Sequence, residues 1–313
     1  MEPSRGIVVA AVDIGTNTLK FSIARCFPDG RIETLEERND AVRIGAGIES
    51  TGRIDPERLD RAVQTLKTFE RAGQDRGARR FVGVATETLR VASNGQDLLD
   101  RIRAETAWQV RTIGGDEEAR LTYLGLEHLL PAGMRATIID IGGGSTEIIA
   151  VTDGQVESAT SIAIGSGRVA DRWFRTDPPG ADALDAAERD ARAFLADHAP
   201  ILAGRGGALL LSGGNGQYIE ELRVQTRLGE GLDLATIRAL LGKLASLPAA
   251  EVASMLDIQV ERAAVLPAGV AIAYAAAIAM QPPVVQAVPS GIRTGLIRDI
   301  IAHEGFASLA GPQ

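Results

Sequence analysis

The fold is decided by a short stretch that occurs twice, first as Val12-Asp13-Ile14-Gly15-Thr16-Asn17-Thr18 and again as Ile139-Asp140-Ile141-Gly142-Gly143-Gly144-Ser145. An apolar run precedes each copy, and a run that begins a second strand follows it. These flanking patterns predict two strands joined by a polar turn. The copies lie too far apart for a solenoid repeat. The repeat therefore predicts two similar α/β lobes, each with the same hairpin, whose turns face each other across a central cleft.

The remaining segments alternate short apolar strands with helices. Outside the two hairpins, strands are predicted over 80–85, 209–211 and 284–288, and helices over 56–73, 98–107, 116–130, 181–203, 234–244, 248–256, 261–266, 267–280 and 291–304. The first of these helices has Asp55 as its N-cap and Pro56 at its first position. We assign residues 1–132 to the first lobe and 133–297 to the second, and expect a C-terminal helix over 298–313 to pack back on the first lobe.

Composition excludes several classes of protein. The 313 residues are 45% hydrophobic and 24% charged, which is typical of a globular chain. No apolar run reaches the roughly 20 residues of a membrane span, and the run from Ile7 to Val12 is too short for a signal peptide, so we expect a cytoplasmic protein without a membrane partner. A net charge of −8 argues against nucleic-acid binding. The single cysteine, Cys26, excludes an internal disulfide.

The repeated turn has the residues that a phosphate-binding loop needs. Glycine lets the backbone approach a phosphate closely, and Ser, Thr and Asn add short donors. The aspartate that ends each first strand offers a hard oxygen ligand to Mg²⁺, which prefers carboxylates, water and phosphate oxygens. The turn is not a Walker A loop, because no Gly-Lys-Ser/Thr follows it, and it is not a Rossmann fingerprint, because it leads into a strand. Two tight turns without a ligand remain the alternative.

Two charged segments lie between the copies of the repeat. Gly114-Gly115-Asp116-Glu117-Glu118 opens a predicted helix, and acids in that place usually interact with the helix dipole. Spacing alone therefore favours a capping role for these acids over Glu118 as a general base. Arg90 follows the strand over 80–85, where an arginine can clamp phosphate oxygens. From the residues alone, an arginine on a solvated helix is the better interpretation of Arg90.

Six motifs, in this order, resemble those of the exopolyphosphatase / guanosine pentaphosphate phosphohydrolase (Ppx/GppA) family of the actin-like ATPase superfamily. The motifs are VDIGTNTLK at residues 12–20, ATETLR at 85–90, GDEEARL at 115–121, IDIGGGSTE at 139–147, LPAG at 266–269 and SGIRTGL at 290–296. The resemblance extends over nearly the whole chain. The resemblance implies an α/β fold of two ribonuclease-H-like domains flanking the cleft. It also implies Mg²⁺- or Mn²⁺-dependent hydrolysis of the terminal phosphoanhydride of inorganic polyphosphate, or of guanosine pentaphosphate.

The resemblance assigns roles residue by residue. Glu118 matches the catalytic glutamate that deprotonates the attacking water, which reverses the preference from spacing alone. The implied catalytic residues are Glu118, Asp140 and Glu147, and the implied metal ligands are Asp13, Asp140 and Glu147. The implied phosphate-binding residues are Asp13, Gly15, Thr16, Asn17, Thr18, Arg90, Gly142, Gly143, Gly144 and Ser145. The implied nucleoside-side loop is Gly213, Gly214, Asn215 and Gly216.

Three residues depart from the family's pattern and bear on substrate preference: Glu87 stands where a small residue is usual, Gln217 where threonine is usual, and Thr294 where glutamate is usual. The leading hypothesis is an exopolyphosphatase acting on short chains, and the alternative is a guanosine pentaphosphate 5′-phosphohydrolase. A superfamily kinase and a non-catalytic nucleotide sensor remain open. The expected partners are polyphosphate or guanosine penta- and tetraphosphate, and a homodimer is left open.

Overall fold

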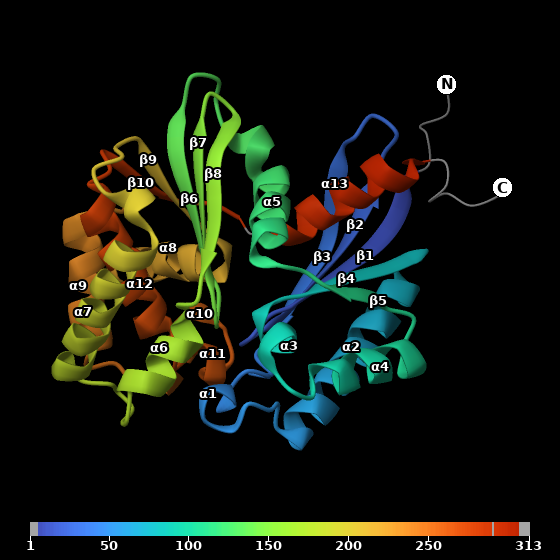
Figure 1. Cartoon of the computed structure of the whole chain (residues 1–313), viewed down its shortest axis with the longest axis horizontal. Coiled ribbons are helices and arrows are strands. Elements are labelled where there is room, and N and C mark those ends of the chain that lie inside the picture. The colour runs from blue at the N-terminus through green and yellow to red at the C-terminus, as the bar shows by residue number, and fades with distance from the viewer. Residues whose placement is uncertain (1–5, 290, 307–313) are drawn as a thin grey trace. The chain divides into compact units, whose positions relative to one another are not determined.

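The computed structural model describes residues 6–289 and 291–306, and these form two compact units (Figure 1). The first unit runs up to Gly125 and resumes at Gly291, while the second begins at Leu126 and ends where the first resumes. The second unit is therefore inserted between two helices of the first. The boundaries that the sequence analysis assigned lie a few residues further along the chain in both places.

The first unit contains one five-stranded sheet in the order β3-β2-β1-β4-β5. Strands β1, β2 and β3 form an antiparallel meander, whereas β4 and β5 run parallel to β1. The strands are β1 (Ile7–Ile14), β2 (Leu19–Cys26), β3 (Ile32–Asp40), β4 (Arg80–Ala85) and β5 (Gln109–Thr112). The helices are α1 (Ile48–Thr51), α2 (Pro56–Asp75), α3 (Glu87–Val91), α4 (Gly95–Glu105), α5 (Gly115–Leu126) and α13 (Ile292–Glu304).

The second unit repeats this sheet strand for strand, in the order β10-β9-β6-β7-β8. Its strands are β6 (Arg135–Ile141), β7 (Thr146–Thr152), β8 (Gln155–Ile162), β9 (Ala208–Ser212) and β10 (Val284–Ala287). Its helices are α6 (Ser166–Trp173), α7 (Ala181–His198), α8 (Gly213–Thr226), α9 (Leu234–Leu244), α10 (Ala249–Leu256), α11 (Val260–Ala263) and α12 (Leu266–Met280), with short 3₁₀ turns at Glu127–Leu129 and Pro200–Leu202. The predicted repeat of hairpins is thus confirmed.

The central strand β1 is buried on both faces, which explains its unbroken apolar run. Successive side chains of a strand point to opposite faces. Ala10, Val12 and Ile14 pack toward α2 and α4, whereas Val9 and Ala11 pack with residues of α5 and α13. The sheet of the first unit therefore lies between two helical layers, and Asp13, one residue before the end of β1, belongs to the face covered by α5 and α13.

Helix α2 forms where the sequence predicts it. The Asp55 carboxylate accepts hydrogen bonds from the backbone N–H groups of Glu57 and Arg58, and Pro56 occupies the first turn. One face of the helix is buried in the core of the first unit through Leu59, Val63, Leu66 and Phe69. The helix continues to Asp75, two residues beyond its predicted end.

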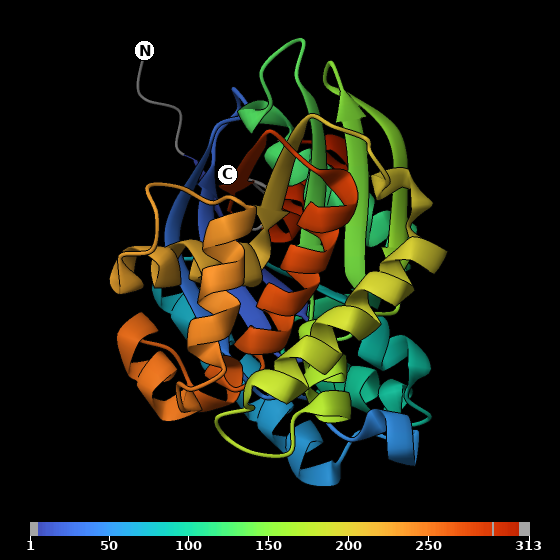
Figure 2. The ribbon, with the colours of Figure 1, turned by 90° about the vertical axis from the view of Figure 1, so that its left-hand side faces the viewer.

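The apolar helix α12 is the core helix of the second unit. It runs beside α7, with which it shares the main helical contact of this unit (Figure 2). The stretch Val260–Met280, which includes α11, is long and apolar enough by composition to cross a membrane, but 78% of its most apolar window is buried inside the protein. This burial makes α12 a core helix rather than an exposed apolar surface.

Three strands were missed by the sequence analysis: β3, β5 and β8. Strand β5 lies at an edge of the first sheet and pairs with β4. Strands β3 and β8 each lie at the edge of their sheet and pair with one neighbour. Most of their side chains are at least partly exposed, and β3 carries four acidic residues and one arginine. Such strands lack the apolar pattern on which the prediction relied.

Burial also determines the chemistry of the single cysteine. Cys26 at the end of β2 is fully buried, and this burial raises the pKa of its thiol from 9.0 to about 11. We therefore expect Cys26 to stay protonated and unreactive toward a thiol-specific disulfide reagent in the native protein at pH 8. One equivalent of reactive thiol should appear on unfolding in urea. Rapid labelling of the native protein at pH 8 would contradict this burial.

Candidate active site

The first predicted loop is the turn between β1 and β2. The N–H of Gly15 donates to the Thr18 carbonyl at 3.2 Å, which closes the turn. The segment after β3 then binds the turn from one side, because Arg43 N–H donates to the Asn17 carbonyl at 2.8 Å and Gly45 N–H donates to the Thr16 carbonyl at 3.0 Å. The carbonyl oxygens of Thr16, Asn17 and Thr18 are therefore occupied by backbone donors.

The second predicted loop, between β6 and β7, repeats this arrangement. The N–H of Gly142 donates to the Ser145 carbonyl at 2.9 Å. The segment after β8, which begins α6, binds the other carbonyls: Ser166 N–H donates to Gly142 at 2.9 Å, and Gly167 N–H donates to Gly143 at 2.9 Å. The third carbonyl, of Gly144, accepts from Arg168 Nε at 3.2 Å. The two turns thus share a construction as well as a sequence.

In the second loop the backbone N–H groups differ from the carbonyl oxygens in their hydrogen bonding. Within residues 6–289 and 291–306, no carbonyl or side chain accepts a hydrogen bond from the N–H of Gly143, Gly144 or Ser145. Successive backbone N–H groups without an internal acceptor form the kind of concavity that binds phosphate. Residues Gly142 to Ser145 therefore have the geometry expected of a phosphate loop.

Glycine is required where the supporting segments touch the loops. A Cβ on Gly165 would lie 2.5 Å from the carbonyl carbon of Gly143, and a Cβ on Gly45 would overlap the side chain of Thr16. Thr16 also accepts a hydrogen bond from the Thr88 hydroxyl of α3 at 2.9 Å. Close backbone approach on one side holds each loop in place.

The aspartates that lie one residue before the ends of β1 and β6 have different partners. Asp13 is 4% exposed, pairs in register with Lys20, and its Oδ2 lies 3.6 Å from Lys20 Nζ. Asp140 is 6% exposed and pairs in register with Glu147. The pair in the first unit thus has no net charge, whereas the corresponding pair in the second unit consists of two carboxylates.

Glu147 is buried beneath the second loop. Its Oε1 accepts hydrogen bonds from the hydroxyls of Ser145 at 2.9 Å and Ser161 at 2.7 Å. A carboxylate oxygen held by two hydroxyls orients those hydroxyls. Glu147 therefore fixes the side chain of Ser145, a predicted phosphate ligand, and Ser161 of β8 is a supporting residue that the sequence analysis did not identify.

Glu118 differs from the acids beside it. It lies in the first turn of α5 and is 9% exposed, whereas Asp116 is exposed and Glu117 forms an ion pair with Arg111 at 2.6 Å. Glu118 is the buried carboxylate of these three neighbours, which makes it the candidate for chemistry. Arg90 is exposed on α3 and donates to the carbonyl of Ile113, just before α5 begins.

The sequence analysis predicted a loop on the nucleoside side, and the structure has a helix there instead. Gly213, Gly214, Asn215 and Gly216 form the first turn of α8, directly after β9. Asn215 is buried and donates to the carbonyl of Ile141 at the end of β6, while Gly213 has a φ of +73° and has no room for a side chain beside the Asp140 carboxylate. Gln217 bonds Glu221 at 2.8 Å along the exposed face of this helix.

Arg262 is a candidate that the motif comparison did not identify. It lies on α11, is 9% exposed, and stands over the ring of Tyr218 at 5.3 Å. A Cβ on Gly214 would lie 3.4 Å from its Nη2, so the guanidinium lies at the start of α8. Burial lowers the pKa of Arg262, and the charge of Asp140 opposes that shift. No carboxylate in the described part of the chain forms an ion pair with Arg262, and a buried cation favours an anionic ligand.

The carboxylates suit a magnesium ion that binds mainly through its substrate. No group of three His, Cys, Asp or Glu side chains within the described residues has metal-binding geometry. Mg²⁺ commonly takes one or two carboxylates and completes its shell with water and phosphate oxygens. Asp140 fits this role, because its register partner is a carboxylate and its Oδ2 accepts a hydrogen bond from the Ser212 hydroxyl at 3.3 Å. Asp13 fits less well, because it is paired with Lys20.

Comparison with known proteins identifies the family. The model of the Ppx/GppA phosphatase family matches residues 23–304. The chain belongs to the Ppx/GppA phosphatase family. Membership makes it a hydrolase of phosphoanhydrides, and the predicted actin-like α/β fold of two ribonuclease-H-like domains is confirmed. The central cleft expected between the two domains stays a prediction.

Solved structures of Ppx/GppA proteins share the fold. An exopolyphosphatase-like protein superposes with a TM-score of 0.82 at 24% identity, and an exopolyphosphatase from Cytophaga hutchinsonii with 0.81 at 23%. The Aquifex aeolicus family member superposes with 0.74 at 23% identity. In all three comparisons 95% of this chain and 98% of the other chain are covered. The fold thus extends over nearly the whole chain.

The contact between α6 and the second loop can be tested by a single methyl group. Gly165→Ala places a Cβ against the Gly143 backbone, and we expect it to lower the free energy of unfolding by about 1–3 kcal/mol. Gly242→Ala in α9, where a Cβ meets nothing within 4 Å, should instead raise it by about 0.5–1 kcal/mol. Urea denaturation of both variants measures the difference, and equal stability of the two would refute the close approach.

Proposed function

We propose that this Ppx/GppA protein is a Mg²⁺-dependent exopolyphosphatase that removes the terminal phosphate of short inorganic polyphosphate chains as orthophosphate. The observation that carries the proposal is the loop at Gly142 to Ser145. The carbonyls of its three glycines are bonded to residues of α6, and the N–H groups of its last three residues have no acceptor in the described chain. Such a loop recognises phosphate oxygens without recognising a base or a sugar. A polymer of phosphate alone matches that chemistry.

The side chains support hydrolysis through water. Phosphoryl transfer depends on positioning and on neutralising charge more than on covalent catalysis. The N–H groups of the second loop and the Ser145 hydroxyl bind oxygens of the terminal phosphate, and the first loop offers Thr16 and Thr18 as further donors. Glu118 accepts the proton of the attacking water, since it offers a carboxylate that is buried in the first turn of α5.

The proposed magnesium ion is held through Asp140, with Glu147 beside it in register. When bound, Mg²⁺ neutralises charge on the phosphate oxygens. Glu147 keeps the Ser145 hydroxyl in position through its hydrogen bonds to Ser145 and Ser161. Manganese, which favours the same oxygen ligands, is the natural substitute.

Guanosine pentaphosphate is the second candidate substrate, and Arg262 favours it. A buried guanidinium over an aromatic ring, at the start of α8, offers a place for an anionic group apart from the loop at Gly142 to Ser145. A nucleotide with phosphate groups at two positions of its ribose can supply such a group. A side-by-side assay on tripolyphosphate, long polyphosphate and guanosine pentaphosphate, with and without Mg²⁺, ranks the candidates.

Glu118→Gln tests the proposed general base. Removing the proton acceptor without changing its shape should lower kcat for phosphate release by about 10²- to 10⁴-fold. Asp116→Asn changes an exposed acid in the same helical turn and should keep the parent rate. The measurement is orthophosphate release from tripolyphosphate in Mg²⁺, with chelator as a blank. A Glu118→Gln enzyme as fast as the parent would remove Glu118 from the mechanism.

Arg262→Gln tests the second anionic site. Losing one charge-assisted hydrogen bond should raise KM about 10- to 100-fold for the substrate that uses the site. Arg238→Gln is the matched control, because Arg238 also stands over a tyrosine ring but is half exposed and paired with Asp185. A KM increase confined to guanosine pentaphosphate favours the alarmone as substrate. An unchanged KM for every substrate would show that Arg262 binds none of them.

A further inference from the structure

The helix that carries Glu118 is held against α13 by glycines. A Cβ on Gly295 would overlap the carbonyl oxygen of Leu121, and a Cβ on Gly125 would overlap the carbonyl oxygen of Gly291. The two backbones therefore touch at both points, which fixes the distance between α5 and α13. Backbone contact alone does not fix how far α5 is rotated about its own axis.

An ion pair between a half-exposed arginine and a buried aspartate supplies the missing constraint. Arg120 Nη1 lies 2.8 Å from Asp299 Oδ1, and Asp299 on α13 is 8% exposed. The hydrogen bond to Asp299 raises the pKa of Arg120. A buried carboxylate bound at this distance defines the position of its guanidinium, whereas exposed surface pairs seldom do.

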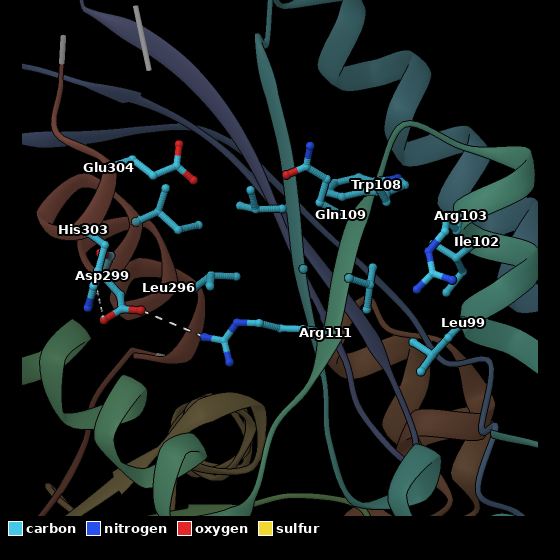
Figure 3. A pocket seen from close by; sticks show the side chains of 14 residues that line it. Leu99, Ile102, Arg103, Trp108, Gln109, Arg111, Leu296, Asp299, His303 and Glu304 are labelled. Carbon is cyan, nitrogen blue, oxygen red and sulfur yellow. Dashed lines mark hydrogen bonds and ion pairs between the residues drawn. The ribbon is translucent and has the colours of Figure 1, made fainter. Parts of the chain in front are cut away.

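Two more charges close the pair into a ring. Arg111 of β5 lies 2.6 Å from Glu117 and 3.9 Å from Asp299, and Arg120 lies 3.8 Å from Glu117. The ring alternates in sign and joins β5, α5 and α13. Figure 3 shows Asp299 facing Arg111 at the edge of a cavity of about 420 Å³. His303, on the same helix as Asp299, is mostly exposed and lies 3.4 Å from it.

The ring and Glu118 use different sides of the same helical turns. A residue two positions along an α-helix is rotated by about 200°, so Arg120 and Glu118 point in nearly opposite directions. Holding Arg120 on Asp299 therefore sets the direction of Glu118. We propose that Asp299 is a positioning residue, which aims the Glu118 carboxylate through Arg120 and the rotation of α5. This inference rests on the role of Glu118 given under the proposed function.

Asp299→Asn tests the inference. The change keeps the shape of the side chain but removes the charge that holds two guanidiniums, and α5 is then free to rotate. We expect kcat to fall roughly 10- to 100-fold, because small displacements of a catalytic group are costly, while KM changes less than about twofold. Asp299→Glu, which keeps the charge, should recover part of kcat.

Asp60→Asn is the matched control, since Asp60 pairs with Arg101 at 2.6 Å in the same unit but has no contact with the ring. Arg120→Gln is a second variant, on the more exposed partner, in case Asp299→Asn does not fold. It should show the same fall in kcat at little cost in thermal stability.

A double-mutant cycle separates positioning from general support. In the Glu118→Gln background, Asp299→Asn should leave the residual rate unchanged, because there is no general base left to aim. A further loss of the same size in that background overturns the inference, and so does an unchanged kcat in Asp299→Asn and Arg120→Gln. If Glu118→Gln alone abolishes turnover while the ring variants are fully active, only the positioning role fails. If Glu118→Gln is itself fully active, the proposed general base fails.

Discussion

Backbone hydrogen bonds from one segment to the carbonyls of each turn are the constraint on which the candidate site depends. In both units the chain leaves the third strand of the sheet and binds the turn between the first two. A peptide carbonyl and the next N–H point in opposite directions across a flat unit, so fixing one fixes the other. The turns therefore present their donors mainly through backbone contacts, and the Arg168 side chain adds one hydrogen bond to the second turn. The close approach also explains why Gly165 cannot carry a side chain.

The two units have the same sheet topology, but the residue pairs at their equivalent hairpins differ in charge. The register places Lys20 opposite Asp13 in one unit and Glu147 opposite Asp140 in the other. A neutral pair and an acidic pair in equivalent places have different affinities for cations. If the turns bind phosphate and Mg²⁺ as proposed, the second unit offers the cation the more acidic of two equivalent places.

Most of the fold could be predicted because the central strands are buried on both faces. Apolar runs that end in Asp-Ile-Gly located both hairpins, and Asp55 with Pro56 located the start of α2. The edge strands β3 and β8 could not be found, since exposed strands carry the polar residues of loops. Helix α8 was also missed, because its first four residues include three glycines, which disfavour a helix unless packing against neighbouring strands requires it.

The candidate site was predicted less completely than the fold. Asp13, Glu118, Asp140 and Glu147 are all buried acids, and motif order alone located them. The burial of Arg262 depends on a helix distant in sequence, and arginines are exposed in most proteins. The hydroxyl of Ser161 acts on Glu147 across a strand pair, a contact that no local pattern encodes. Supporting residues of this kind depend on tertiary pairing, so a single sequence reveals them poorly.

Helix α13 completes the first unit only after the entire second unit has been synthesised. During translation, α5 leaves the ribosome without the helix that later packs against its glycines. Contacts between segments so far apart in the sequence form slowly and late in folding, because a long stretch of chain must first be ordered between them. A nascent chain consequently acquires the fixed orientation of its buried glutamate as one of the last events of its folding.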